Sequence, residues 1–166
     1  MNKAIILTLA TACSALLLAE PLSSQSIVVT PEVSREAFVE RVSQDLDRQL
    51  ERAARLNEPH GNGIAIVRFT RDAEGGADDV RIYRASGKFG IDRIAMRAVN
   101  RLDSLDRVPA GTPRNQVYQA NIIFARSKQE LARLAGQLAA EEAARLAQGE
   151  DAHVFAFGSV AAPPSS

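Results

Sequence analysis

The chain contains no tryptophan, and aromatic residues make up only 5% of its 166 residues. Proteins that bind single-stranded nucleic acid stack bases on aromatic side chains, so this scarcity argues against such a function. Lys and Arg number 20, as do Asp and Glu, so no net charge draws the chain to nucleic acid or to anionic lipid. Composition therefore disfavours nucleic acid as a partner.

Residues that commonly hold metals or act as nucleophiles are also scarce. The histidines His60 and His153 and the single cysteine, Cys13, do not have the spacing of a zinc site. Ser86 precedes a glycine but lacks the Gly-x-Ser-x-Gly context of a nucleophile elbow. The acidic residues between positions 72 and 79 lack calcium-loop spacing and suit a solvated hairpin tip. We therefore predict a protein that is not an enzyme and that uses no cofactor or metal.

The first residues resemble a secretory signal peptide. A lysine precedes the apolar run 4–19, which ends before the roughly 20 residues that span a bilayer comfortably. A small-x-small site at residues 24–26 predicts cleavage, so that residues 1–26 are the signal peptide and the mature chain starts near Ile27. The alternative is an uncleaved run that anchors the chain in the inner membrane.

An amphipathic helix followed by a ββαβ unit is predicted between residues 31 and 124. The helix has Thr30 or Ser34 as its N-cap, and its apolar stripe recurs at three- and four-residue steps. That stripe is Val39, Val42, Leu46, Leu50 and Ala53. The strands of the unit are residues 64–70, 80–83 and Val117–Phe124, and its helix is residues 91–102. This order predicts an α+β domain with a small three-stranded antiparallel sheet.

Several branched residues fall on the sheet face opposite these two helices, and an apolar face must be covered or used. They are Ile64, Ile66, Val117 and Ile123. Residues 126–148 are rich in Ala and carry a leucine stripe, so we predict an extra C-terminal helix that covers this face. A dimeric coiled coil is the alternative. Residues 149–166 end in Pro-Pro-Ser-Ser and are predicted to be a disordered tail.

The ordered set of motifs over residues 27–125 resembles the C-terminal domain of the TonB family of energy transducers. The matching segments are Gly63 with 64–69, the turn 72–76, Val-Arg-Ile-Tyr-Arg-Ala-Ser-Gly at 80–87, the helix motif at 91–99, Pro109 and Ile-Ile-Phe at 122–124. Two positions differ from the family pattern, Arg71 and Ala85.

The resemblance implies a periplasmic cell-envelope module that binds a partner segment, with a wider role in TonB-dependent transport across the outer membrane. In this family, a short receptor segment, the TonB box, is added as a strand beside the last strand of the domain, a mode known as β-augmentation. The partner-binding residues implied here are Gln116, Val117, Tyr118, Gln119, Ala120, Asn121, Ile122, Ile123 and Phe124. The expected partner is an outer-membrane TonB-dependent receptor or another envelope protein.

Three alternatives accompany this interpretation. A structural or assembly module similar to the TolA C-terminal domain would form homodimers through the same edge. An anchored energy transducer would keep the run 4–19, although Leu18 stands where the family's anchor motif has a histidine, and no long Pro-rich spacer follows. Finally, the β-branched segment 27–30 resembles a TonB box. One hypothesis is that it occupies the docking edge, either of its own chain or of a second copy. The alternative is that it is an ordinary strand or chain terminus before the helix.

Overall fold

The chain divides into two compact units, residues 1–30 and 31–166. The computed structural model describes residues 33–56, 61–149 and 153–161, all of which belong to the second unit. The predicted signal peptide and the segment 27–30 lie outside the described residues. Within the described ranges, no helix is both long enough and apolar enough to cross a membrane.

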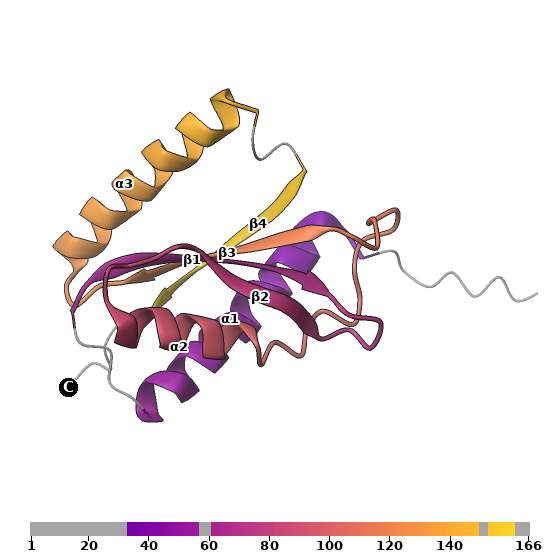
Figure 1. The fold of residues 1–166 in the computed structure, drawn as a ribbon, viewed down its shortest axis with the longest axis horizontal. Coiled ribbons are helices and arrows are strands. Elements are labelled where there is room, and N and C mark those ends of the chain that lie inside the picture. Colours follow the sequence, from indigo (N-terminus) through magenta and orange to yellow (C-terminus); the bar gives the residue numbers. More distant parts are fainter. Residues whose placement is uncertain (1–32, 57–60, 150–152, 162–166) are drawn as a thin grey trace, which may run out of the picture. The chain divides into compact units, whose positions relative to one another are not determined.

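The second unit is an α+β fold built on a four-stranded mixed sheet (Figure 1). Its strands are β1 (Gly63–Arg71), β2 (Ala77–Arg84), β3 (Val117–Phe124) and β4 (Val154–Ala161), arranged in the order β2-β1-β3-β4. β1 pairs antiparallel with β2 and with β3, whereas β4 runs parallel to β3. The three predicted strands and their order are confirmed, but the prediction of a three-stranded, wholly antiparallel sheet is wrong.

Helix α1 (Arg35–Leu56) begins after Ser34, whose Oγ accepts a hydrogen bond from the backbone N–H of Ala37 at 3.1 Å. Of the two N-caps considered, Ser34 is therefore the one used. Four residues of the predicted stripe are fully or almost fully buried, and Phe38 extends the buried face. The buried stripe residues are Val42, Leu46, Leu50 and Ala53.

Helix α2 (Phe89–Val99) shares one sheet face with α1. Its buried side carries Ile91, Ile94 and Ala95, which meet the inward side chains of β1, including Val67 and Phe69, in the main core. Residue Asp92 in its first turn accepts a hydrogen bond from the backbone N–H of Ser86 at 2.8 Å. The Ser-Gly turn before α2 thus has a structural role at the start of the helix.

Helix α3 (Lys128–Ala147) lies on the opposite face of the sheet from α1 and α2, as Figure 1 shows. The Ser127 Oγ caps it by accepting from the N–H of Glu130 at 3.2 Å. Leu134 is buried against Ile64, Ile66 and Ile123. The extra C-terminal helix and its place over the second apolar face are therefore confirmed.

Strand β4 shows that the prediction of a disordered tail over residues 149–166 is wrong for Val154–Ala161, which pairs with β3 along its whole length. Residues 150–152 and 162–166 of the predicted tail lie outside the described residues. The physical reason is an alternation: Phe155, Phe157 and Ser159 are buried while Ala156 and Gly158 are exposed. Burial of two phenylalanines and backbone pairing with β3 together offset the entropy lost when this terminal segment is ordered. A helix between two parallel strands is also the usual connection, since parallel strands need a long crossover.

Candidate functional site

The predicted docking strand, β3, lies in the interior of the sheet. One long edge pairs with β1 and the other with β4. Gln116 precedes the strand, and Val117 at its start is half-buried. The side chains that face the main core are Tyr118, Ala120, Ile122 and Phe124. Those that face the α3 side of the sheet are Gln119, Asn121 and Ile123. The interpretation of residues 116–124 as an open edge is therefore wrong while β4 is in place, because the fourth strand takes up the backbone groups on that side.

A cluster of aromatic rings holds β4 against the rest of the core. Phe155 lies edge-on to Phe38, with ring centroids 5.2 Å apart, and 6.0 Å from Tyr118. Phe157 lies edge-on to Phe69 at 6.1 Å, and Phe69 stacks on Tyr118 at 5.4 Å. These five residues are most of the aromatic residues in the chain. Edge-to-face pairs of this kind add to the stability gained from burial alone.

Polar contacts fix the same strand to α1 and to the start of β3. The Arg35 guanidinium lies over the Phe155 ring, 4.4 Å from its centroid. The Ser159 hydroxyl donates to Asp47 of α1. At the other end of the strand, Gln116 Nε2 donates to the backbone carbonyl of His153 at 2.6 Å. β4 is therefore an integral part of the folded unit.

The two outer edges of the sheet differ in how they are protected. β2 carries Asp78, Asp79, Arg81 and Arg84, its pairing with β1 contains register shifts, and Asp79 has a positive φ of 47°. Charges and bulges of this kind prevent another strand from adding to an edge. β4 contains neither a charged residue nor a proline over Val154–Ala161, and no described segment pairs with its outer side. Among the described residues, β4 is therefore the edge of the sheet that lacks such protection.

On the α3 side of the sheet, β4 presents only small or β-branched side chains. Ala156, Gly158 and Val160 are exposed, the last with 44% of its surface accessible. Their register partners on β3 are Gln119, Asn121 and Ile123. An added strand would therefore meet little steric obstruction from side chains on this face.

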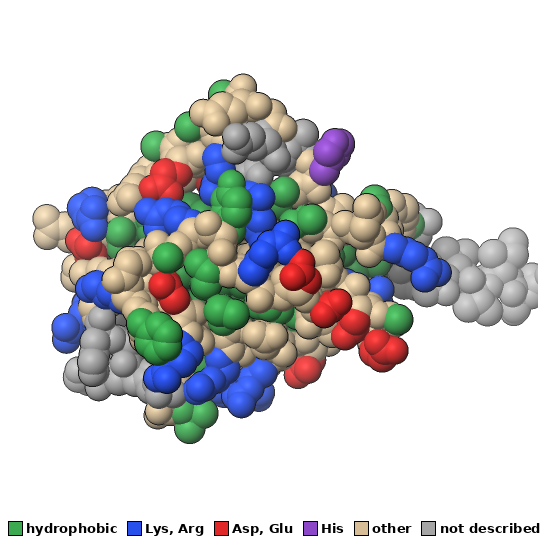
Figure 2. All heavy atoms as spheres, in the orientation of Figure 1, with side chains coloured by type: hydrophobic (Ala, Val, Ile, Leu, Met, Phe, Trp, Pro, Cys, Tyr) green, Lys and Arg blue, Asp and Glu red, His purple; other side chains and the backbone are tan. Residues whose placement is uncertain are grey.

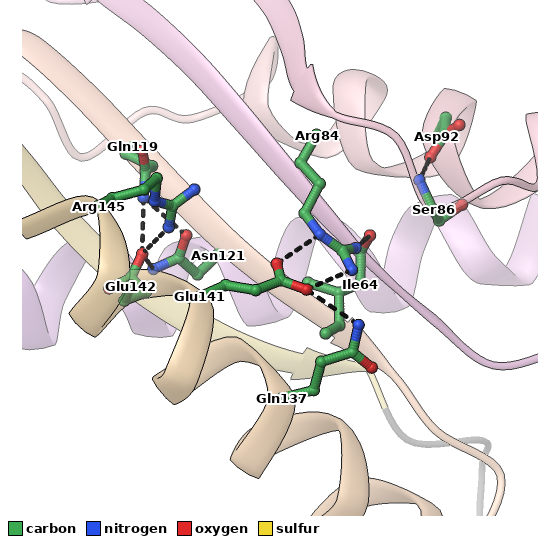
Figure 3. Close-up of polar contacts among 10 residues, drawn as sticks. All are labelled: Ile64, Arg84, Ser86, Asp92, Gln119, Asn121, Gln137, Glu141, Glu142 and Arg145. Atoms are coloured by element: carbon green, nitrogen blue, oxygen red, sulfur yellow. Dashed lines mark hydrogen bonds and ion pairs between the residues drawn. The ribbon is translucent and has the colours of Figure 1, made fainter. Parts of the chain in front are cut away.

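A polar network under α3 adjoins this surface (Figure 3). Glu142 Oε1 accepts hydrogen bonds from Gln119 Nε2 at 2.9 Å, from Asn121 Nδ2 at 3.0 Å and from Arg145 Nη2 at 2.6 Å. One carboxylate of α3 thereby satisfies two amide side chains that β3 directs away from the main core. The middle of β3 is consequently linked to the last turns of α3.

Glu141 forms the second link between α3 and the sheet. Arg84 of β2 contacts its carboxylate at 2.7 and 2.9 Å, and also donates to the backbone carbonyl of Ile64 at 2.7 Å (Figure 3). Burial raises the pKa of the Glu141 carboxyl, but hydrogen bonds from Arg84 and Gln137, with the nearby positive charges, bring this pKa below its usual value. Glu141 therefore stays ionised and paired at neutral pH.

Chemistry-bearing side chains do not gather elsewhere in the part of the chain that the structure describes. No three His, Cys, Asp or Glu side chains in these residues lie close enough together to hold a metal ion. His153 is exposed just before β4, and Ser86 sits in the turn before α2. The feature that sequence reasoning missed is β4, for which the alternation of Phe155 and Phe157 was the available signal.

No family model, curated protein or solved structure significantly matches the chain. The resemblance to the TonB C-terminal domain therefore stays a prediction from sequence motifs.

Proposed function

We propose that this protein is a noncatalytic binding module that takes an extended segment of a cell-envelope partner as a fifth strand along the outer edge of β4. The observation that carries the proposal is the contrast between the two edges: β2 is charged and irregular, whereas β4 is uncharged and lacks a described partner. Unpaired N–H and C=O groups of such an edge supply affinity, and alternate side chains supply selectivity.

Free energies favour addition to β4 over replacement of β4. Removing this strand would expose Phe155 and Phe157, which are 8% and 4% accessible. Exposing two such side chains costs about 3–6 kcal/mol, before the lost ring contacts are considered. A partner strand that adds to the outer edge of β4 does not incur this cost. We therefore propose Val154–Ala161 as the docking strand, in place of Gln116–Phe124, which the TonB resemblance implies.

The same edge supports the homodimer considered above, because two uncharged edges can pair with each other. A TonB-dependent receptor is the partner that the motif resemblance suggests, and transport across the outer membrane is the corresponding process. The anchored-transducer alternative depends on the run 4–19, which lies outside the described residues.

The test is a titration of TonB-box peptides into the chain from Ile27 onward, followed by backbone NMR. We expect shifts centred on Val154–Ala161. Replacing Ala156 and Val160 with Lys should abolish binding, since charged side chains protect an edge. A matched control carries Lys at Ala132 and Ala139, two exposed positions of α3, and should bind normally. Light scattering on the same samples reports whether a homodimer is lost instead.

A disulfide lock separates addition from replacement. Val117 and Val154 are half-buried register partners on β3 and β4, and the chain from Ile27 contains no cysteine. Val117→Cys with Val154→Cys, once oxidised, should hold β4 in place and leave peptide binding intact. Binding that disappears on oxidation and returns on reduction would show that the peptide replaces β4. Absence of both peptide binding and dimer formation would refute strand docking altogether.

A further inference from the structure

The exposed side of α2 and the adjacent strand β2 form an apolar groove of about 540 Å³. Its apolar lining includes Ile82, Met96 and Phe89, and the Phe89 side chain is 79% exposed. A single exposed aromatic side chain is common, but a concave apolar surface with polar groups at its rim is typical of a binding site. The groove is large enough for a few side chains of a ligand.

Arginines line the groove along α2. Arg93 and Arg97 are four residues apart on one side of α2, and Arg101, in the turn that follows the helix, lines the same groove. Within the described residues, no carboxylate pairs with Arg97 or Arg101. The one acidic residue of the lining, Asp92, accepts the hydrogen bond from the N–H of Ser86. Lys and Arg side chains gather over the region that α2 occupies, while Asp and Glu side chains gather near the β1–β2 turn (Figure 2).

We propose that this groove binds an acidic peptide segment of a partner protein, whose apolar side chains enter the groove and whose carboxylates pair with Arg97 and Arg101. The guanidinium group matches a carboxylate in a paired hydrogen-bond geometry, so Arg97 and Arg101 select Asp or Glu. A concave apolar surface favours inserted side chains, whereas a membrane-binding surface places apolar side chains into the lipid. Charge and shape together favour an acidic peptide over an anionic membrane.

This site is independent of strand docking at β4. The groove borders β2, and β2 and β4 are the two opposite edges of the sheet. A partner can therefore contact the α2 groove whether or not a strand is added to β4. Failure of one proposal leaves the other standing, because the variants that test them share no residue.

The experiment measures fluorescence anisotropy of labelled peptides with the chain from Ile27 onward. The probes are eight-residue peptides of Asp and Glu that carry two Leu or Phe residues at separations of one to four positions. Matched peptides carry Asn and Gln instead of the acids. We expect at least one acidic peptide to bind, more weakly as salt rises, and its neutral counterpart to bind markedly less.

Variants connect the binding to the groove. Arg97→Glu with Arg101→Glu should weaken binding about tenfold or more, since two attractions become repulsions. Phe89→Ser, at an exposed position, should weaken it without affecting folding. Arg114→Glu with Arg126→Glu changes the net charge equally at exposed positions outside the groove and should bind like the parent. Unchanged binding in the Arg97 and Arg101 variant, no binding of any acidic peptide below about 1 mM, or binding only to vesicles of anionic lipid would overturn the proposal.

Discussion

Asp45 is a buried carboxylate at the centre of α1, with only 3% of its surface accessible. Its Oδ2 accepts the backbone N–H groups of Asp103 and Ser104, at 2.8 and 3.1 Å, and its Oδ1 accepts from Gln49 Nε2 at 3.3 Å. The Asp45 side chain thus links α1 to the loop that follows α2. The apolar stripe of α1 predicted the helix, but a carboxylate within that stripe does not reveal which backbone it will bind, since the loop lies 58 residues further along the chain.

Replacing Asp45 with Ala should destabilise the folded unit by about 1.5–3 kcal/mol, because two buried N–H groups lose a charged acceptor. Urea denaturation followed by circular dichroism measures the change. Glu51→Ala, at an exposed position of the same helix, is the control and should stay within about 0.5 kcal/mol of the parent. Equal stability of the two variants would show that the contact with residues 103 and 104 contributes nothing.

The same residue gives the stability an acid dependence. Burial raises the pKa of Asp45, but hydrogen bonds from residues 103, 104 and 49 and the charge of Arg48 outweigh it, so that its pKa is lowered from 3.8. A lowered pKa means that the unfolded state takes up the proton first as pH falls. The contribution of Asp45 to the free energy of unfolding is therefore fully present above pH 3.8 and is lost as the pH falls through the lower pKa of the folded state. Asp45→Asn should therefore make the free energy of unfolding less dependent on pH in this acidic range.

At the scale of elements, six of the seven helices and strands in the described residues follow from local patterns. Periodicity predicted α1, α2 and α3, and alternation predicted β1, β2 and β3 to within a few residues at their ends. β4 was missed because its alternation is short, because a Pro-Pro-Ser-Ser sequence follows it, and because its order depends on partners far away in sequence. Those partners are Phe38 and Phe69, which no local window around residue 157 contains.

Phe157→Ala should cost about 3–5 kcal/mol of unfolding free energy, the usual price of removing a buried aromatic ring. Chemical denaturation measures it, with Ala156→Ser on the exposed face of the same strand as the control. A loss of less than about 1 kcal/mol would mean that β4 is only loosely attached. In that case replacement of β4 by a partner strand would become the better explanation of docking.

Glu142→Ala should loosen the last turns of α3, because Gln119 and Asn121 lose their shared acceptor and Arg145 loses its ion pair with Glu142. We expect faster amide hydrogen exchange over residues 141–147 and a global loss of about 1 kcal/mol. Gln129→Ala, at an exposed position in the first turn of α3, is the control. Exchange rates that match the control would show that the Glu142 network does not hold α3 in place, and would leave that role to the apolar contacts of Leu134 and to the Glu141–Arg84 pair.

At the scale of the whole molecule, the sequence predicted the pairing within the sheet better than the edges of the sheet. The ββαβ order correctly indicated that β1 pairs with β2 and β3 in a small sheet, but the last strand of that unit is covered by a fourth strand, so the predicted open edge is wrong. Which strand ends a sheet depends on every strand that joins it, so one unrecognised strand moves the edge. The groove on α2 was not predicted either, because it combines β2 with α2 and local patterns describe each element alone.

The position of β4 in the sheet also determines how late during synthesis the domain can finish folding. β4 contacts α1, so the first and last described elements of the unit meet in one core. A chain that is still leaving the ribosome has Phe38, Phe69 and Tyr118 already made but lacks Phe155 and Phe157 to cover them. Final folding therefore waits for nearly the last residue described, and until then the nascent chain presents an aromatic surface to chaperones.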